Sequence, residues 1–137
     1  MQPGAVRRVL ERSRAMKPAL PLADILEKDW QRTVTDLAKQ LGWRIYHTHD
    51  SRRSAHGFPD LVLVRDRDRV IYLELKREKT KPTPEQVAWI RDLIGAGAEA
   101  YIARPSDLEQ LAQILASRSY PDGAYELETA TRREIAA

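Results

Sequence analysis

The sequence predicts an α/β domain in which helices flank a small mixed β-sheet, in the order helix, three strands, helix, strand, helix. Two observations carry this prediction. Short apolar runs at 61–64 and 70–73 are joined by a charged turn, as in a hairpin covered on both faces. Apolar residues spaced three and four apart over 22–41 indicate an amphipathic helix before them.

Length and composition limit the class of protein. A chain of 137 residues, 42% hydrophobic and 31% charged, suits one globular domain. No apolar run reaches the ~18 residues needed to span a bilayer, and the N-terminus lacks the apolar core of a signal peptide. The absence of cysteine excludes disulfides and cysteine zinc sites. We therefore expect an intracellular, cytoplasmic protein.

Charge is unevenly distributed along the chain. The net charge is +3, yet residues 1–21 alone carry five basic residues against Glu11, a balance of +4. We expect a basic N-terminal arm over 1–19, a folded domain over 20–118 and a C-terminal tail over 119–137, the last being either frayed or a partner-binding segment. A basic arm on a nearly neutral domain favours a polyanionic partner such as nucleic acid.

The first helix, predicted over 22–41, ends at Gly42. Glu27 and Gln31 lie four residues apart beside its apolar stripe, so both are expected to face the sheet. Residues 43–48 alternate in the manner of a half-buried strand.

A polar loop, 49–57, follows that strand and ends beside Asp60. Such loops carry ligand-contacting groups, and Arg52, Arg53 and Ser54 offer donors for phosphate oxygens. The histidines of this region lack the spacing of a helical zinc site, so we expect them to touch DNA or to be exposed.

Three charges interrupt the hairpin. Asp60 opens its first strand, and Glu74 and Lys76 point to one face of its second. If the strands pair, Asp60 lies near Glu74, and two crowded carboxylates favour a divalent cation, Mg²⁺ or Mn²⁺. Lys76 could then orient or deprotonate a water molecule. The competing interpretation is a solvent-facing hairpin with scattered charges.

The segments around the hairpin are less specific. The turn at 65–69 is predicted to be solvated, and Arg77 and Lys79 either rim the site and hold a DNA backbone or belong to a solvated loop. Thr83 and Gln86 form a predicted capping box at the start of the second helix. A last strand is expected over 98–103, followed by a helix that Ser106 caps.

Three segments, HGFPDLVLV, YLELK and TPEQVAWIRDLIGAG, resemble the PD-(D/E)xK nuclease superfamily and within it the VRR-NUC branch, over about residues 22–104. The resemblance implies a restriction-endonuclease-like αβββαβ core and a metal-dependent DNA phosphodiesterase of a bacterium or phage. It implies that Asp60, Glu74 and the Leu75 carbonyl hold Mg²⁺ (or Mn²⁺), that Glu27 completes the cluster, and that Gln86 approaches the active site to bind water or phosphate.

Stand-alone members of this branch are similar to Holliday-junction resolvases, which implies structure-selective cleavage of branched DNA. Symmetric cutting of two strands favours a homodimer. Two alternatives stay open: a nuclease for flaps, nicks or ends, and a non-catalytic DNA-binding module on the same fold.

Overall fold

The computed structural model describes residues 4, 7–8, 11, 20–49, 55–118 and 124–137. Four strands form one mixed sheet in the order β1–β2–β3–β4, with β3 antiparallel to β2 and parallel to β4. The strands are β1 (Arg44–His47), β2 (Leu61–Arg65), β3 (Arg69–Leu75) and β4 (Glu99–Ala103). The helices are η1 (Leu22–Asp24), α2 (Glu27–Gln40), α3 (Pro84–Gly95), η2 (Pro105–Asp107), α4 (Leu108–Ala116) and α5 (Ala124–Ala136).

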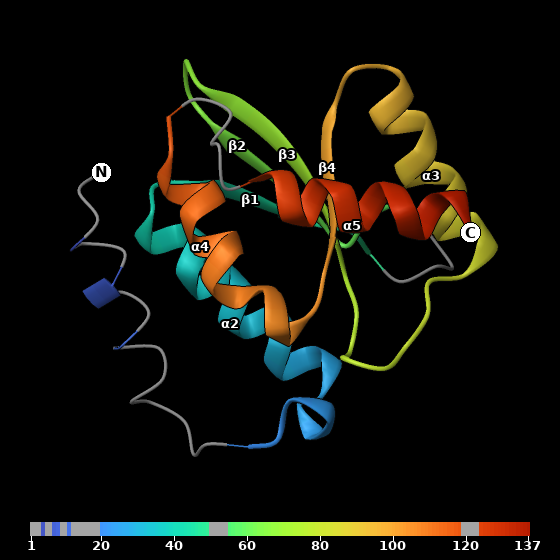
Figure 1. The fold of residues 1–137 in the computed structure, drawn as a ribbon. Coiled ribbons are helices and arrows are strands. Elements are labelled where there is room, and N and C mark those ends of the chain that lie inside the picture. Colours follow the sequence, from blue (N-terminus) through green and yellow to red (C-terminus); the bar gives the residue numbers. More distant parts are fainter. Residues whose placement is uncertain (1–3, 5–6, 9–10, 12–19, 50–54, 119–123) are drawn as a thin grey trace.

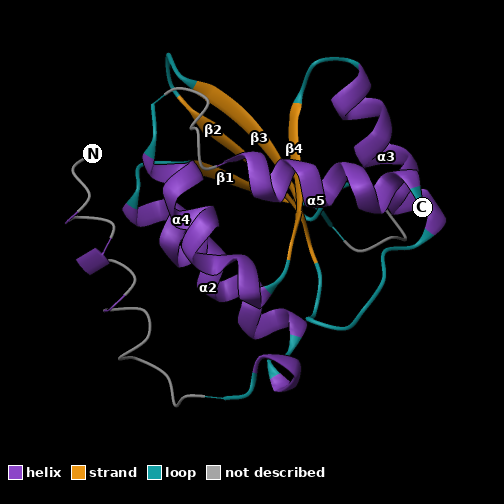
Figure 2. Ribbon diagram, viewed as in Figure 1, coloured by secondary structure: helices purple, strands orange, loops and turns teal. Residues whose placement is uncertain are grey.

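Helices cover the sheet on both faces (Figures 1 and 2). Helices α2 and α4 pack on one face over the larger core, which includes Trp30, Leu63 and Leu73. Helix α3 packs on the other face over a smaller core around Ile90 and Ile102. This architecture confirms the predicted fold class. In the described part of the chain, no helix is long and apolar enough to cross a membrane.

The C-terminal segment is part of the folded body. Helix α5 crosses β4 in Figure 1, and its Leu127 and Ile135 side chains are buried. Buried Thr131 accepts a hydrogen bond from the Ile102 N–H at 3.2 Å, which occupies a donor on the edge strand β4. The sequence had suggested a tail here. The threonine interrupts the apolar stripe of α5 and weakens its helical pattern.

The first helix was predicted to begin at Leu22, but it begins at Glu27. Residues 22–24 form a separate 3-10 turn, and Ile25 is extended. Leu22 and Leu26 are each 46% exposed, so they do not contribute to the core. The guanidinium group of Arg77 donates to the carbonyls of residues 23 and 25, which are thereby withdrawn from a continuous helix.

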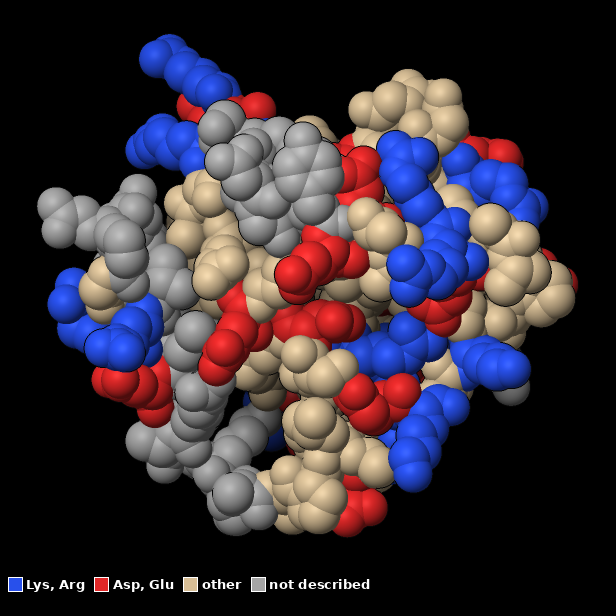
Figure 3. Space-filling view, viewed as in Figure 1, with Lys and Arg blue, Asp and Glu red and all other residues tan. Residues whose placement is uncertain are grey.

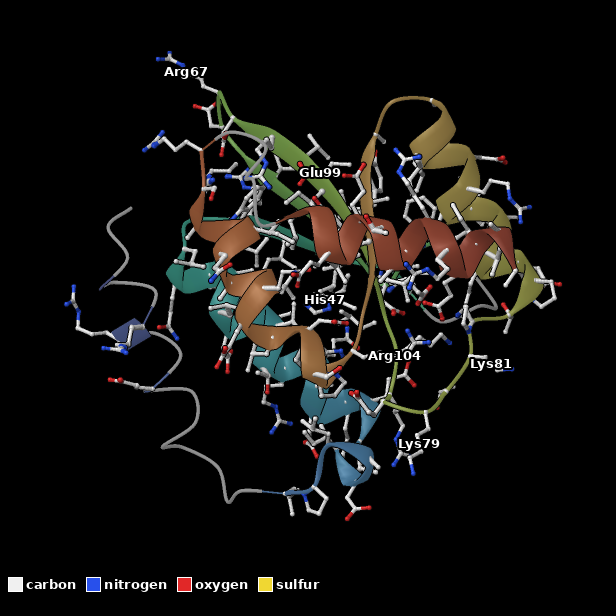
Figure 4. The ribbon with its side chains drawn as sticks, in the orientation of Figure 1. His47, Arg67, Lys79, Lys81, Glu99 and Arg104 are labelled. Atoms are coloured by element: carbon white, nitrogen blue, oxygen red, sulfur yellow. The ribbon has the colours of Figure 1, made fainter. Side chains whose placement is uncertain are left out.

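The turn of the hairpin is not the solvated loop that the sequence predicted. Arg69 donates to both carboxylate oxygens of Glu99, at 3.0 and 2.8 Å, and to the Ile114 carbonyl at 2.9 Å. Arg65 donates to the Leu115 carbonyl at 2.7 Å. The two arginines therefore satisfy carbonyls at the C-terminal end of α4, where cations are favourable. At the tip of the hairpin, Arg67 does project into solvent (Figure 4).

The predicted cap of the last core helix is wrong in detail. A 3-10 turn over 105–107 precedes α4, whose N-cap residue is Asp107 rather than Ser106. The Asp107 carboxylate accepts the Arg104 N–H at 2.8 Å, and burial raises the pKa of Asp107. Proline at position 105 favours the tighter turn because it supplies no N–H.

Candidate active site

The hairpin brings two acidic residues together at one end of the sheet. Leu61 pairs with Leu73, so Asp60 and Glu74 stand opposite each other and point to the same face. The Asp60 carboxylate accepts a hydrogen bond from the Leu75 N–H at 2.8 Å. The backbone carbonyl of Asp60 accepts one from the Thr48 N–H at 2.9 Å. Asp60 is therefore fixed by backbone contacts from both neighbouring strands.

Glu74 is buried beside a second carboxylate, that of Asp60. Its side chain is 1% exposed, and within the described residues neither carboxylate oxygen has a hydrogen-bond partner. Burial, reinforced by the adjacent Asp60 carboxylate, raises the pKa of Glu74 to about 10, and Glu27 adds to the rise. A buried oxygen pair of this kind favours a proton or a bound cation.

Lys76 shares the same electrostatic environment. It is 9% exposed, and its positive charge opposes the rise in the pKa of Glu74. The backbone N–H of Lys76 donates to the Ala103 carbonyl at 3.0 Å, which also accepts the indole N–H of Trp30 at 3.1 Å. The backbone of Lys76 is therefore held by β4, whose Ala103 is in turn bonded to Trp30 of α2.

Glu27 lies near this group without completing a metal cluster by itself. It is the first residue of α2 and is exposed, and its negative charge contributes to the raised pKa of Glu74. Among the residues that the structure describes, no three His, Asp or Glu side chains are grouped closely enough to hold a metal ion. The arrangement provides two carboxylates, a number that suits Mg²⁺ because this ion keeps waters and takes phosphate oxygens.

The glycine before Asp60 seats its loop on α3. Gly57 has a φ of 84°, and a Cβ there would lie 2.5 Å from the backbone carbon of Glu85. The indole N–H of Trp89 donates to the His56 carbonyl at 3.1 Å. The partner of this close approach, the first turn of α3, is distant in the sequence and is identified only by the fold.

Gln86 has the structural role that the sequence allowed. Its side-chain oxygen accepts the Thr83 N–H at 2.8 Å, and its own N–H donates to the Thr83 hydroxyl at 3.2 Å. The capping box is therefore present. Its predicted part in the active site remains a prediction.

The candidate DNA-binding residues differ in their surroundings. Arg52, Arg53 and Ser54 lie outside the described residues. The guanidinium group of Arg77 contacts the carbonyls at 23 and 25. Lys79 is exposed on the loop after β3 (Figure 4).

Basic side chains are more frequent on one side of the molecule. Figure 3 shows them on the side of α3 and the C-terminal half of α5, with acidic side chains among them, and other basic side chains lie at the left of the view. Arg104 belongs to the basic side and donates to the Thr80 carbonyl at 2.9 Å and to Glu134 at 2.6 Å. The loop that carries Lys79 is therefore held to α5.

The αβββαβ core is that of a PD-(D/E)xK nuclease fold, and Asp60, Glu74 and Lys76 lie on one face of its sheet. The VRR-NUC domain model matches residues 3–107, so the chain belongs to the VRR-NUC family of this superfamily. A solved structure described as a VRR_NUC domain has 24% identity and a TM-score of 0.55, covering 65% of this chain and 92% of that one. A search of the curated proteins finds no match. The chain is thus a nuclease-like, DNA-processing domain.

Proposed function

We propose that this protein is a Mg²⁺-dependent (or Mn²⁺-dependent) endonuclease that hydrolyses DNA phosphodiester bonds, with a preference for branched DNA such as a Holliday junction. The observation that carries the proposal is the buried Glu74 carboxylate beside Asp60, neither oxygen of which accepts a hydrogen bond from the described residues. A divalent cation would compensate both charges, as it does at phosphoryl-transfer sites generally.

The residues present fit such a cation. Asp60 and Glu74 would hold it, with the Leu75 carbonyl as a further oxygen ligand. The N–H and C=O of one strand residue point to the same side of the strand, and the Leu75 N–H already points to the Asp60 carboxylate. When bound, a divalent cation supplies charge stabilisation for the phosphate and an activated water. Exposed Glu27 would order water at the rim of the site.

Lys76 has two properties that suit it to the reaction. Its ammonium group lies within the field of Glu74, and its side chain is nearly buried, so its charge is weakly screened. We assign it the orientation of the attacking water and the stabilisation of charge that develops on the phosphate. Asp60, fixed by the Leu75 N–H, requires no rearrangement before it can act as a ligand.

Substrate preference rests on size and symmetry. The described domain offers a single compact fold, which suits recognition of DNA shape better than the reading of a base sequence. Cutting two strands of a four-way junction symmetrically would require a two-fold homodimer. We therefore include the homodimer in the proposal.

Supercoiled, forked and four-way DNA, each incubated with Mg²⁺ or with EDTA, test this function. We expect cutting with Mg²⁺ only, paired cuts on opposing strands of the junction, and a fall of about 10³-fold in Lys76→Ala. Lys81→Ala is the matched control because Lys81 is an exposed lysine on the loop that follows Lys76 (Figure 4). Binding without cutting under any divalent metal would contradict the proposal, and cuts confined to flaps or ends would contradict its junction preference.

A further inference from the structure

A row of apolar side chains lies beside the acidic pair on the same sheet face. Tyr46 pairs with Val62, and Val62 pairs with Tyr72, so the three side chains cross β1, β2 and β3 in line. Asp60 and Glu74 form the next row on this face, two residues along each strand, or about 7 Å away. The row is therefore within reach of a nucleotide bound at the acidic pair.

Part of this row is open to solvent. Tyr46 is 55% exposed, and Val64 and Val70, one row further along the hairpin, are 40% and 44% exposed. Helix α3 packs chiefly against β4 on this face and reaches Tyr72, whereas Tyr46 on the edge strand β1 stays open to solvent. A hollow of about 570 Å³, lined in part by Val70 and Tyr72, adjoins the row. Exposed aromatic and branched side chains in one continuous surface point to a binding surface.

The row continues onto α3 through two further aromatic rings. Phe58 meets Tyr72 edge to face at 6.2 Å between ring centroids, and meets Trp89 at 5.0 Å. Both Phe58 and Trp89 are partly exposed. Because Phe58 is two residues before Asp60, the aromatic surface borders the acidic pair on the loop side as well.

We propose that Tyr46, Tyr72, Phe58 and Trp89 form a stacking surface for an unpaired nucleobase next to the phosphodiester held at Asp60 and Glu74. The inference rests on the proposed nuclease function and gives it a structural basis for selectivity. Inside a duplex, neighbouring bases cover each other's faces, so an unpaired base is much more available than a duplex base to stack on protein rings. Stacking on aromatic side chains tolerates any base, which suits selection by DNA structure.

Binding of forked and fully paired DNA by the Lys76→Ala protein in Mg²⁺ tests the proposal with the DNA left intact. We expect Tyr46→Ala, added to that background, to weaken binding of the fork about 5- to 150-fold and to leave binding of the duplex unchanged. Tyr46→Phe, which keeps the ring, should bind as Tyr46 does. Leu20→Ala is the control, since Leu20 is 56% exposed and lies outside the row.

Tryptophan fluorescence gives a second measurement. Of the three tryptophans, Trp30 and Trp43 are 2% and 4% exposed, and Trp89 is the one with partial exposure. Forked DNA should protect Trp89 from acrylamide quenching, whereas duplex DNA should not.

Equal loss for fork and duplex, or no loss for either, would overturn the stacking surface, as would equal protection of Trp89 by both DNAs. An unaltered protein that neither binds nor cuts any DNA would instead overturn the proposed nuclease function.

Discussion

The two faces of the sheet have different tasks. On the face of α2 and α4, the side chains of Leu61, Leu63, Ile71 and Leu73 are fully buried and wholly apolar. On the face of α3, the same two strands carry Asp60, Glu74 and exposed Val64. Because strand side chains alternate, one hairpin supplies both the apolar core of one face and the charged groups of the other.

This division explains how a buried carboxylate can be tolerated. Dehydrating Glu74 beside Asp60 costs free energy because its oxygens accept no hydrogen bond from the described residues, and the closed face provides the apolar burial that offsets this cost. The site thus depends on a core that lies only one residue away along the same strand. The comparison predicts that substitutions on the two faces separate stability from activity.

The largest expected effect is the difference in free energy of unfolding between substitutions at two neighbouring residues of β2. Leu63 is 0% exposed and Val64 is 40% exposed, and they point to opposite faces. Leu63→Ala should lower the free energy of unfolding by about 2–5 kcal/mol, whereas Val64→Ala should change it by less than about 1 kcal/mol. Urea unfolding followed by circular dichroism measures both. Equal losses in the two variants would contradict the division between the faces.

A smaller effect concerns pH and Glu74. Because burial beside Asp60 raises the pKa of Glu74 from 4.5 to about 10, the metal-free native protein keeps a proton that the unfolded chain releases. Its free energy of unfolding should therefore fall as pH rises through this window. Glu74→Gln cannot titrate, so it should flatten the slope and raise stability at pH 8 by about 1–3 kcal/mol.

Thermal unfolding from pH 5 to pH 9 in EDTA checks this prediction. Added Mn²⁺ should stabilise the unaltered protein more as pH rises, because the cation displaces the proton of Glu74. Glu74→Gln should lose most of that dependence. The same slope in both proteins would show that Glu74 does not hold the proton.

Local patterns allowed much of the fold to be predicted from the sequence. The hairpin placed Asp60 against Glu74 because register follows from pairing across a short turn, and the Thr83–Gln86 box followed from three-residue spacing. What failed depended on partners distant in the chain. Arg65 and Arg69 lie in a charged turn that resembles a solvated one, and only the end of α4 gives them their role.

The candidate site shows the same limit. The acidic residues stand in a recognisable motif, but the aromatic neighbours of Asp60 come from β1, β3 and α3 and share no spacing in the sequence. Burial of Glu74 likewise depends on the whole surrounding structure. Sequence reasoning could identify the charges of the site, whereas their environment required the fold.

A further effect, about as large as the one expected for Glu74→Gln, tests whether the Thr131 hydroxyl of α5 protects the edge of the sheet. Thr131→Val keeps the shape of the buried side chain but removes the hydroxyl that accepts the Ile102 N–H. An unsatisfied buried donor should lower the free energy of unfolding by about 1–3 kcal/mol, and hydrogen exchange at Ile102 should accelerate. Thr129→Val, at an exposed position on the same helix, is the matched control. If both variants behave alike, the Thr131 hydroxyl is not the group that protects the edge of β4.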